Sequence, residues 1–131
     1  PARVIDAGSR PNNASVVLLM HVGSLDLLLS GDVEPEAQAA IMAAHRPVDV
    51  DVAKVPHHGS RYQDPGFAAW TGARIALISV GQDNDYGHPA SSTVAAWQAA
   101  GARVLRTDEL GAIAVVQAPD GAATAIAQGR D

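Results

Sequence analysis

The chain has 131 residues and no cysteine, so its length fits one domain, and disulfides and thiolate metal sites are excluded. Hydrophobic residues make up 47% and charged residues 18%, a balance that supplies a packed core and argues against intrinsic disorder. The formal net charge of −5 argues against a basic nucleic-acid footprint on this chain, unless metal ions or a neighbouring domain supply positive charge.

The first half of the chain predicts a loop, a hairpin, a helix and a strand. Residues 1–13 are rich in Gly, Pro and Asn, which is typical of a loop. Runs of β-branched residues and leucine at residues 15–22 and 25–30 flank a Gly-Ser pair and predict a hairpin with a tight turn. Proline and glutamate residues suit the first turn of a helix, which we expect over residues 34–45. Residues 48–55 alternate Val and Ala with Asp and Lys and predict a strand.

The second half continues the alternation of helices and strands. Residues 64–70 predict a short helix, and the apolar run 74–80 predicts a strand covered on both faces. The polar loop 81–89 is long enough to be functional, and a Ser-Ser-Thr cap predicts a helix over residues 91–100. Three more strands, separated by turns, are predicted over residues 103–107, 112–117 and 123–127. We expect the second of these to pair back onto the first and the third to lie at an edge, which predicts an α/β fold with a mixed β-sheet flanked by helices.

Side chains suited to metal binding or acid–base chemistry follow three of the predicted strands, where open sheets usually hold their ligands. Asp32 follows the second strand, and its carboxylate suits a divalent cation or can bridge two. The alternative is that Asp32 caps the helix that begins at residue 34. His57 and His58 follow the third strand, and imidazole is a common ligand of Zn or Mn. Adjacent residues on an extended segment point in opposite directions, so we expect at most one of them to face a given ion.

The polar loop supplies the third candidate. His88 lies between glycine and proline and could hold a phosphoryl oxygen or protonate a leaving group, or it could simply precede the helix. Tyr86 could donate a hydrogen bond from the same loop. Asn12 and Asn13 could close the site, although an Asn-Asn pair usually forms a turn.

Other polar and aromatic residues are interpreted structurally. Lys54 is expected to be a solvated strand residue rather than a phosphate ligand. His21 and His45 are assigned to strand and helix faces without function. Trp70 and Trp97 are expected to be core or interface anchors.

Five blocks of sequence, in this order, resemble the metallo-β-lactamase-like domain at the C-terminal end of ComEC-type competence proteins. They are Asn12-Asn13-Ala14-Ser15-Val16-Val17-Leu18, Leu27-Leu28-Leu29-Ser30-Gly31-Asp32, Asp51-Val52-Ala53-Lys54-Val55-Pro56-His57-His58-Gly59-Ser60, Ile78-Ser79-Val80-Gly81 leading to Tyr86-Gly87-His88-Pro89, and Arg106-Thr107-Asp108 with Gly111-Ala112-Ile113. The resemblance covers residues 12 to about 116.

The resemblance implies a fold, a site and a function. The fold implied is an αββα sandwich with a two-metal hydrolytic site holding two divalent ions, Zn or Mn. Asp32 resembles the bridging metal carboxylate, the His57–His58 pair resembles the last ligand motif, and His88 resembles the histidine on the substrate side. ComEC proteins are membrane channels for DNA uptake, and their extracytoplasmic metallo-β-lactamase-like domain is thought to degrade the strand that is not imported. The partners implied are therefore single-stranded DNA and the membrane channel portion of the same polypeptide.

The family's first motif, His-x-His-x-Asp-His, is absent from this sequence. We therefore expect residues 1–131 to form a single partial domain, the C-terminal half of the sandwich, with its boundary set by nature or by experiment. A dinuclear centre needs about twice the three protein ligands found here. We expect the fragment alone to be soluble, to bind metal poorly and to be inactive, and its exposed sheet face to be covered by a second copy or another chain.

Two alternatives keep the fold and change the function. One is another phosphodiesterase of the superfamily, similar to phosphorylcholine esterases. The other is a non-catalytic scaffold domain of the channel.

Overall fold

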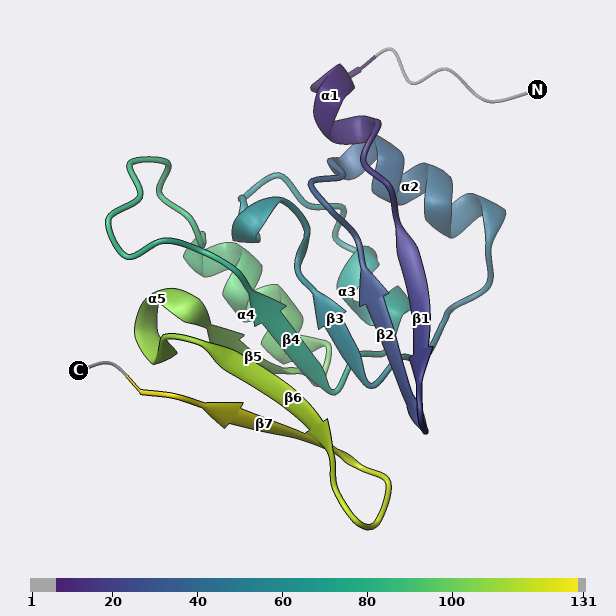
Figure 1. The fold of residues 1–131 in the computed structure, drawn as a ribbon. Coiled ribbons are helices and arrows are strands. Elements are labelled where there is room, and N and C mark those ends of the chain that lie inside the picture. Colours follow the sequence, from purple (N-terminus) through teal and green to yellow (C-terminus); the bar gives the residue numbers. More distant parts are fainter. Residues whose placement is uncertain (1–6, 130–131) are drawn as a thin grey trace.

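A computed structural model describes residues 7–129 as an α/β domain built on a five-stranded mixed sheet (Figure 1). Its strands are β1 (Leu18–Val22), β2 (Leu25–Leu29), β3 (Val52–Lys54), β4 (Ile75–Ile78) and β5 (Arg103–Arg106). They lie side by side in sequence order, and β1 is antiparallel to β2 whereas all other neighbours are parallel. The mixed sheet flanked by helices confirms the predicted fold class and is consistent with half of a metallo-β-lactamase-like sandwich.

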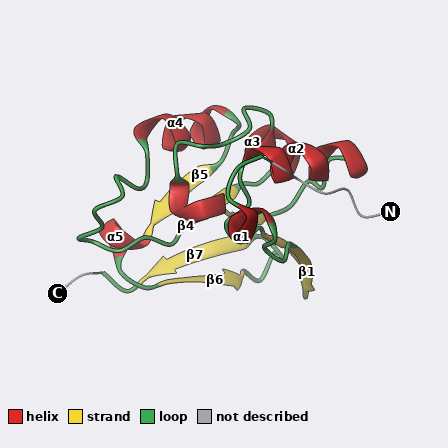
Figure 2. Cartoon of the chain, turned by 90° about the horizontal axis from the view of Figure 1, so that it is seen from above, coloured by secondary structure: helices red, strands yellow, loops and turns green. Residues whose placement is uncertain are grey.

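Three helices cover one face of the sheet, as the view along its edge shows (Figure 2). They are α2 (Pro35–Ala44), α3 (Phe67–Thr71) and α4 (Ser91–Ala99). Their apolar side chains pack on the helix-facing residues of β3 and β4. These residues, Ala53, Ala76 and Ile78, are fully buried. Three single turns complete the helical elements: α1 (Arg10–Asn13), the 3₁₀ turn η1 (Pro56–Gly59) and α5 (Thr107–Leu110). Among residues 7–129, no helix combines the length and the apolar character needed to cross a membrane.

A separate hairpin covers part of the other face. It consists of β6 (Ile113–Gln117) and β7 (Ala123–Ala127), which pair with each other in a two-stranded sheet. Its inward side chains pack against a second apolar cluster on the main sheet, formed by Val52, Ile75 and Leu105. Central strands are therefore buried on both faces, as the apolar run at 74–80 predicted.

The prediction that residues 112–117 pair back onto the strand 103–107 is wrong. Residues 108–111, expected to be a turn, mostly lie in the one-turn helix α5, and Gly111 follows it with φ 73° and ψ −143°. This bend carries the chain out of the sheet plane, so that β6 lies across the sheet and pairs with β7.

Two other boundaries differ from the prediction. The segment 10–13 forms α1 rather than loop, while residues 1–6 of the same predicted loop lie outside the described residues. The predicted strand 48–55 shortens to three residues. Asp49 has a positive φ of 50°, and the amides of Val48 and Val50 donate to the carbonyls of Trp70 and Thr71 instead of to a strand.

Strand β1 forms one edge of the main sheet and is exposed along its whole length. Leu18, Leu19, Met20 and Val22 are all among its exposed residues. The sequence expectation that a second copy or another chain covers an open face stays a prediction.

The helix-side core is centred on an aromatic group. Phe67, 1% exposed, stacks on Trp70 with ring centroids 5.6 Å apart and meets the edge of Trp97 at 6.5 Å. Trp70 and Trp97 are both buried, which confirms their predicted role as core anchors.

We predict that Phe67→Ala lowers the free energy of unfolding by about 3–5 kcal/mol, because it leaves a cavity between two tryptophans. Urea denaturation measures this. The matched control Ile126→Ala, at a residue 55% exposed on β7, should cost less than about 1 kcal/mol. Equal losses in the two variants would show that the aromatic group does not anchor the core.

Candidate functional site

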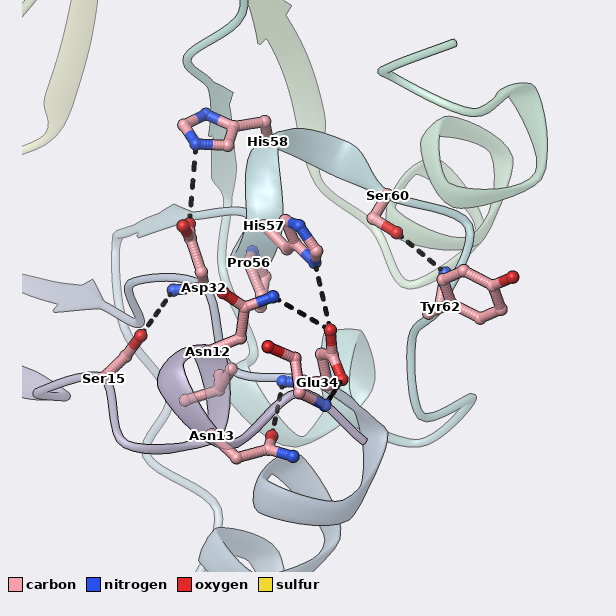
Figure 3. Close-up of polar contacts among 12 residues, drawn as sticks. Asn12, Asn13, Ser15, Asp32, Glu34, Pro56, His57, His58, Ser60 and Tyr62 are labelled. Atoms are coloured by element: carbon pink, nitrogen blue, oxygen red, sulfur yellow. Dashed lines mark hydrogen bonds and ion pairs between the residues drawn. The ribbon is translucent and has the colours of Figure 1, made fainter. Parts of the chain in front are cut away.

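The predicted site residues meet at one rim of the sheet, at the carboxyl ends of its parallel strands. Asp32 follows β2, His57 and His58 lie in η1 directly after β3, and His88 lies in the loop that follows β4. Figure 3 shows Asp32 and the two η1 histidines in this arrangement, with Glu34 below them.

His58 faces Asp32. The distance from His58 Nε2 to Asp32 Oδ1 is 3.5 Å, and His58 Nδ1 lies 2.7 Å from the carbonyl oxygen of Ser79. A carbonyl can only accept, so Nδ1 carries the proton, and in the neutral ring Nε2 presents its lone pair toward Asp32. A histidine held in this way by its other nitrogen has the arrangement common to metal ligands. The carboxylate and this nitrogen can therefore share a cation.

Asp32 is held by its own neighbours rather than by α2. Its amide donates to Ser15 Oγ at 3.1 Å (Figure 3). The helix α2 has Glu34 at its N-cap and no side-chain capping bond, so the interpretation of Asp32 as a helix cap is wrong.

Lys54 is an internal brace of the site. Its Nζ donates to the carbonyls of Gly31 at 2.9 Å and Val55 at 3.3 Å, and it lies 3.8 Å from Asp32 Oδ1. Its side chain is only 23% exposed, so the prediction of a solvated strand lysine is wrong. Burial lowers the pKa of Lys54 from 10.5, against the raising effect of Asp32. The residue ties the turn that holds Asp32 to the end of β3.

His57 faces the other way, toward Glu34. Its Nδ1 is 3.8 Å from Glu34 Oε1, and it is buried without a hydrogen-bond partner among the described residues. The two rings therefore lie beside different acidic side chains, and the expectation that at most one of them faces a given ion stays a prediction. The segment is not extended, as that expectation assumed: His57 and His58 have φ of 48° and 53°, in the left-handed region.

Sequence reasoning missed Glu34 as a site residue and treated it only as the start of a helix. Its carboxylate accepts from the amide of Ser9 at 2.7 Å and from Asn12 Nδ2 at 2.9 Å, while its own amide donates to Asn13 Oδ1 (Figure 3). The hydrogen bond from Ser9 is the main cause that lowers the pKa of Glu34 below 4.5, followed by the bond from Asn12 and the proximity of His57. The Asn pair thus lies in the single turn α1, one of the two possibilities left open for it, and both side chains also contact Glu34.

His88 lies beside His57, with ring centroids 5.6 Å apart, and stacks on Tyr86 at 5.9 Å. Asn84 holds its backbone on both sides: Nδ2 donates to the carbonyl of His88 at 2.8 Å, and Oδ1 accepts from its amide at 3.1 Å. Burial lowers the pKa of His88 from 6.5, and the neighbouring His57 and His58 lower it further. At neutral pH His88 is therefore a neutral imidazole.

The two loops that hold the histidines touch at Gly59. The amide of Ala90 donates to the carbonyl of Gly59 at 2.9 Å. Gly59 has a φ of 78°, and a Cβ placed on it would lie 2.6 Å from Pro89 Cβ. The contact requires a glycine for both its conformation and its lack of a side chain.

The remaining histidines lie elsewhere. His21 is on β1 beside Asp26, and His45 ends α2, where its carbonyl accepts from Trp70 Nε1 at 3.3 Å. Neither is joined to the Asp32–His58 pair by an ion pair or hydrogen bond among the described residues.

The donors of the site fit part of a metal shell. Asp32 and His58 offer one carboxylate oxygen and one imidazole nitrogen to a shared position. Within residues 7–129, no three His, Asp or Glu side chains come together as a group that could hold an ion. The described residues thus supply two donors of such a shell.

The fold is that of an α/β domain with a mixed five-stranded sheet flanked by helices, which is consistent with half of a metallo-β-lactamase-like sandwich. Over 103 residues, 78% of the chain, the sequence is 38% identical to ComE operon protein 3 of Bacillus subtilis (strain 168). Over 104 residues, also 78% of the chain, it is 30% identical to competence protein ComA of Neisseria gonorrhoeae. The chain therefore belongs to the ComEC-type family of competence proteins. It spans only 13% and 15% of the lengths of these two relatives.

No protein-family profile matches the chain, and no solved structure matches it.

We predict that Glu34→Gln lowers the free energy of unfolding by about 1 kcal/mol at pH 7, because a neutral amide accepts the Ser9 and Asn12 bonds less strongly. The pKa of Glu34 is lowered in the folded state, so its contribution is complete above pH 4.5 and is lost as the pH falls through the folded pKa. Denaturation at several pH values should show the two proteins converging in acid. In the Asn12→Ala background, Glu34→Gln should cause a smaller loss of unfolding free energy. A loss in Glu34→Gln that is the same at every pH would contradict the lowered pKa of Glu34.

We predict that His88 titrates below pH 6.5 in ¹H–¹⁵N NMR, since burial and two neighbouring imidazoles disfavour its charged form. His57→Asn should raise this pKa toward 6.5 without reaching it, because burial is the larger cause. His45→Asn serves as the matched control and should leave the His88 titration unchanged. A wild-type pKa at or above 6.5 would contradict the prediction.

Proposed function

We propose that this chain is part of a metal-dependent phosphodiesterase that hydrolyses DNA during competence, with the strand that is not imported as its substrate. The observation that supports this most is the approach of Asp32 Oδ1 and His58 Nε2 to 3.5 Å at the carboxyl ends of parallel strands. The names of the two relatives support a role in competence and hence in DNA uptake.

Asp32 and His58 would hold a divalent ion, and the ions of a two-metal site activate water and polarise a phosphodiester when bound. The chain prepares both ligands. Lys54 braces the turn before Asp32, and the carbonyl of Ser79 sets the tautomer of His58. His57, next to Glu34, is the candidate for a contact to a second ion or to substrate.

His88 has the properties of a hydrogen-bond donor to phosphate. Because its pKa is lowered, the ring is neutral at pH 7 and provides one N–H without carrying a charge. Donation to a non-bridging phosphoryl oxygen therefore suits His88 better than proton transfer to a leaving group, which needs the charged form. Asn84 fixes the backbone from which this ring projects.

The proposal needs more ligands than the described residues offer. A dinuclear centre takes about six protein ligands, and Asp32 and His58 are two. We propose that the others come from a longer polypeptide of the relatives' kind, and that the chain by itself binds Zn or Mn weakly and does not hydrolyse DNA. The channel portion of that polypeptide and an extracytoplasmic position belong to the same proposal.

A second candidate, a scaffold domain without catalysis, is favoured by one observation. Among residues 7–129 no group of three potential metal ligands exists. A scaffold would use the acid–imidazole pairs only to hold loops in place.

The two candidates differ in what they require of the ligands. In the longer polypeptide, we predict that Asp32→Asn and His58→Gln each lower the rate of DNA hydrolysis by about 100-fold or more, because each removes a metal donor. The matched control His45→Gln should leave the rate unchanged. Hydrolysis assays with single-stranded DNA and with a small phosphodiester would also test the substrate class. Wild-type rates of hydrolysis in both variants would contradict the two-metal proposal. Absence of hydrolysis by the wild-type longer polypeptide would favour the scaffold.

A further inference from the structure

A cavity of about 580 Å³ opens next to the candidate site, between the segment that follows η1 and the loop 81–90. Its lining includes the acid and two imidazoles of the candidate site, Glu34, His57 and His88. It also includes Arg61, Tyr62 and Tyr86. The chain has two tyrosines in all, and both line this cavity.

Both tyrosines are exposed to solvent, and Tyr86 more so than Tyr62. Tyr86 is 84% exposed and Tyr62 is 55% exposed, although both are large rings of the kind that proteins usually bury. The ring of Tyr86 lies 17° from the plane of the His88 ring, with centroids 5.9 Å apart. The two rings are nearly parallel, yet Tyr86 stays largely exposed, so a flat group can stack on the Tyr86 ring beside His88.

The cavity is lined by one charge of each sign: the carboxylate of Glu34, which accepts hydrogen bonds from Ser9 and Asn12, and the guanidinium of Arg61. Arg61 lies over the Tyr62 ring, with Cζ 4.9 Å from the ring centroid, and its Nη2 donates to the Tyr62 hydroxyl at 2.7 Å. These two contacts hold the guanidinium at the cavity wall and leave its other N–H groups available. A guanidinium is charged at all relevant pH values and suits phosphate geometry.

We propose that this cavity binds single-stranded DNA, with a base stacked on Tyr86 and a backbone phosphate paired with Arg61. The proposal deepens the proposed function and rests on it, because it names the surface that leads the strand toward His57 and His88. A single strand fits and a duplex does not, because only unpaired nucleotides offer a free base face beside the phosphate. Stacking on an aromatic ring tolerates any base, which suits a protein that acts on DNA regardless of sequence.

Equilibrium binding tests the proposal without hydrolysis. Fluorescence anisotropy of the 131-residue chain with labelled oligo(dT), in EDTA, is compared with an abasic oligomer of the same length. We expect Tyr86→Ala to weaken oligo(dT) binding by about 5- to 150-fold and to leave abasic binding unchanged. Tyr86→Phe, which keeps the ring, should retain affinity.

Arg61→Gln should weaken both oligomers and reduce the salt dependence of binding by about one charge. The matched control is Arg103→Gln on β5, an exposed arginine at the opposite end of the strands, which should change affinity little. Circular dichroism and urea denaturation check that each variant is folded.

Three outcomes would overturn the proposal: no measurable binding of oligo(dT) by the wild-type chain, an equal effect of Tyr86→Ala on both oligomers, or an effect of Arg103→Gln as large as that of Arg61→Gln. The assay contains EDTA and therefore no free metal ion, so it measures binding through Tyr86 independently of catalysis. Binding of oligo(dT) through Tyr86, together with no DNA hydrolysis by the longer polypeptide, would refute the proposed function and keep the stacking site.

Discussion

Two consecutive non-glycine residues in the left-handed backbone region determine how the candidate site is built. His57 and His58 adopt this conformation directly after β3, at a cost of about 1–3 kcal/mol each. Hydrogen bonds offset the cost: the amide of His57 donates to the carbonyl of Gly31, and His58 Nδ1 donates to the carbonyl of Ser79. Because the turn closes at once, the two rings remain at the rim, where one meets Asp32 and the other meets Glu34.

The carboxylates of the rim, Asp32 and Glu34, are only partly compensated by positive charge. Each acid has an imidazole beside it, and Lys54 lies close to Asp32. The neutral His88 adds no charge at pH 7. A phosphodiester is therefore repelled by the carboxylate charge that Lys54 leaves uncompensated, and neutral imidazoles do not attract it. Attraction has to come from bound cations or from the guanidinium of Arg61. For this reason the two proposals place contacts to a phosphodiester both at the Asp32–His58 pair and at Arg61.

The sequence predicts the location of the site better than its internal contacts. Asp32, His57 and His88 each follow an apolar run, and the rule that parallel strands share a carboxyl edge is enough to bring them together. The rule does not give the direction of the side chains. That direction depends here on a left-handed turn, which a pair of histidines does not predict because non-glycine residues rarely adopt it. Glu34 was missed because the sequence around a glutamate that precedes proline indicates the start of a helix. It does not show that the carboxylate also accepts a hydrogen bond from Asn12, which is distant in sequence. The pairing of β6 with β7 likewise depends on the bend after α5.

Gly59 contributes no functional group, yet it sets the separation of the imidazoles. It lies between the segment of His57 and the loop of His88, with Pro89 packed where its side chain would be. A side chain at this point would clash with Pro89, so the two loops would have to move apart to accommodate it. The spacing of the three rings consequently depends on a backbone contact, so that a change at residue 59 would alter it while every side chain of the candidate site stays the same.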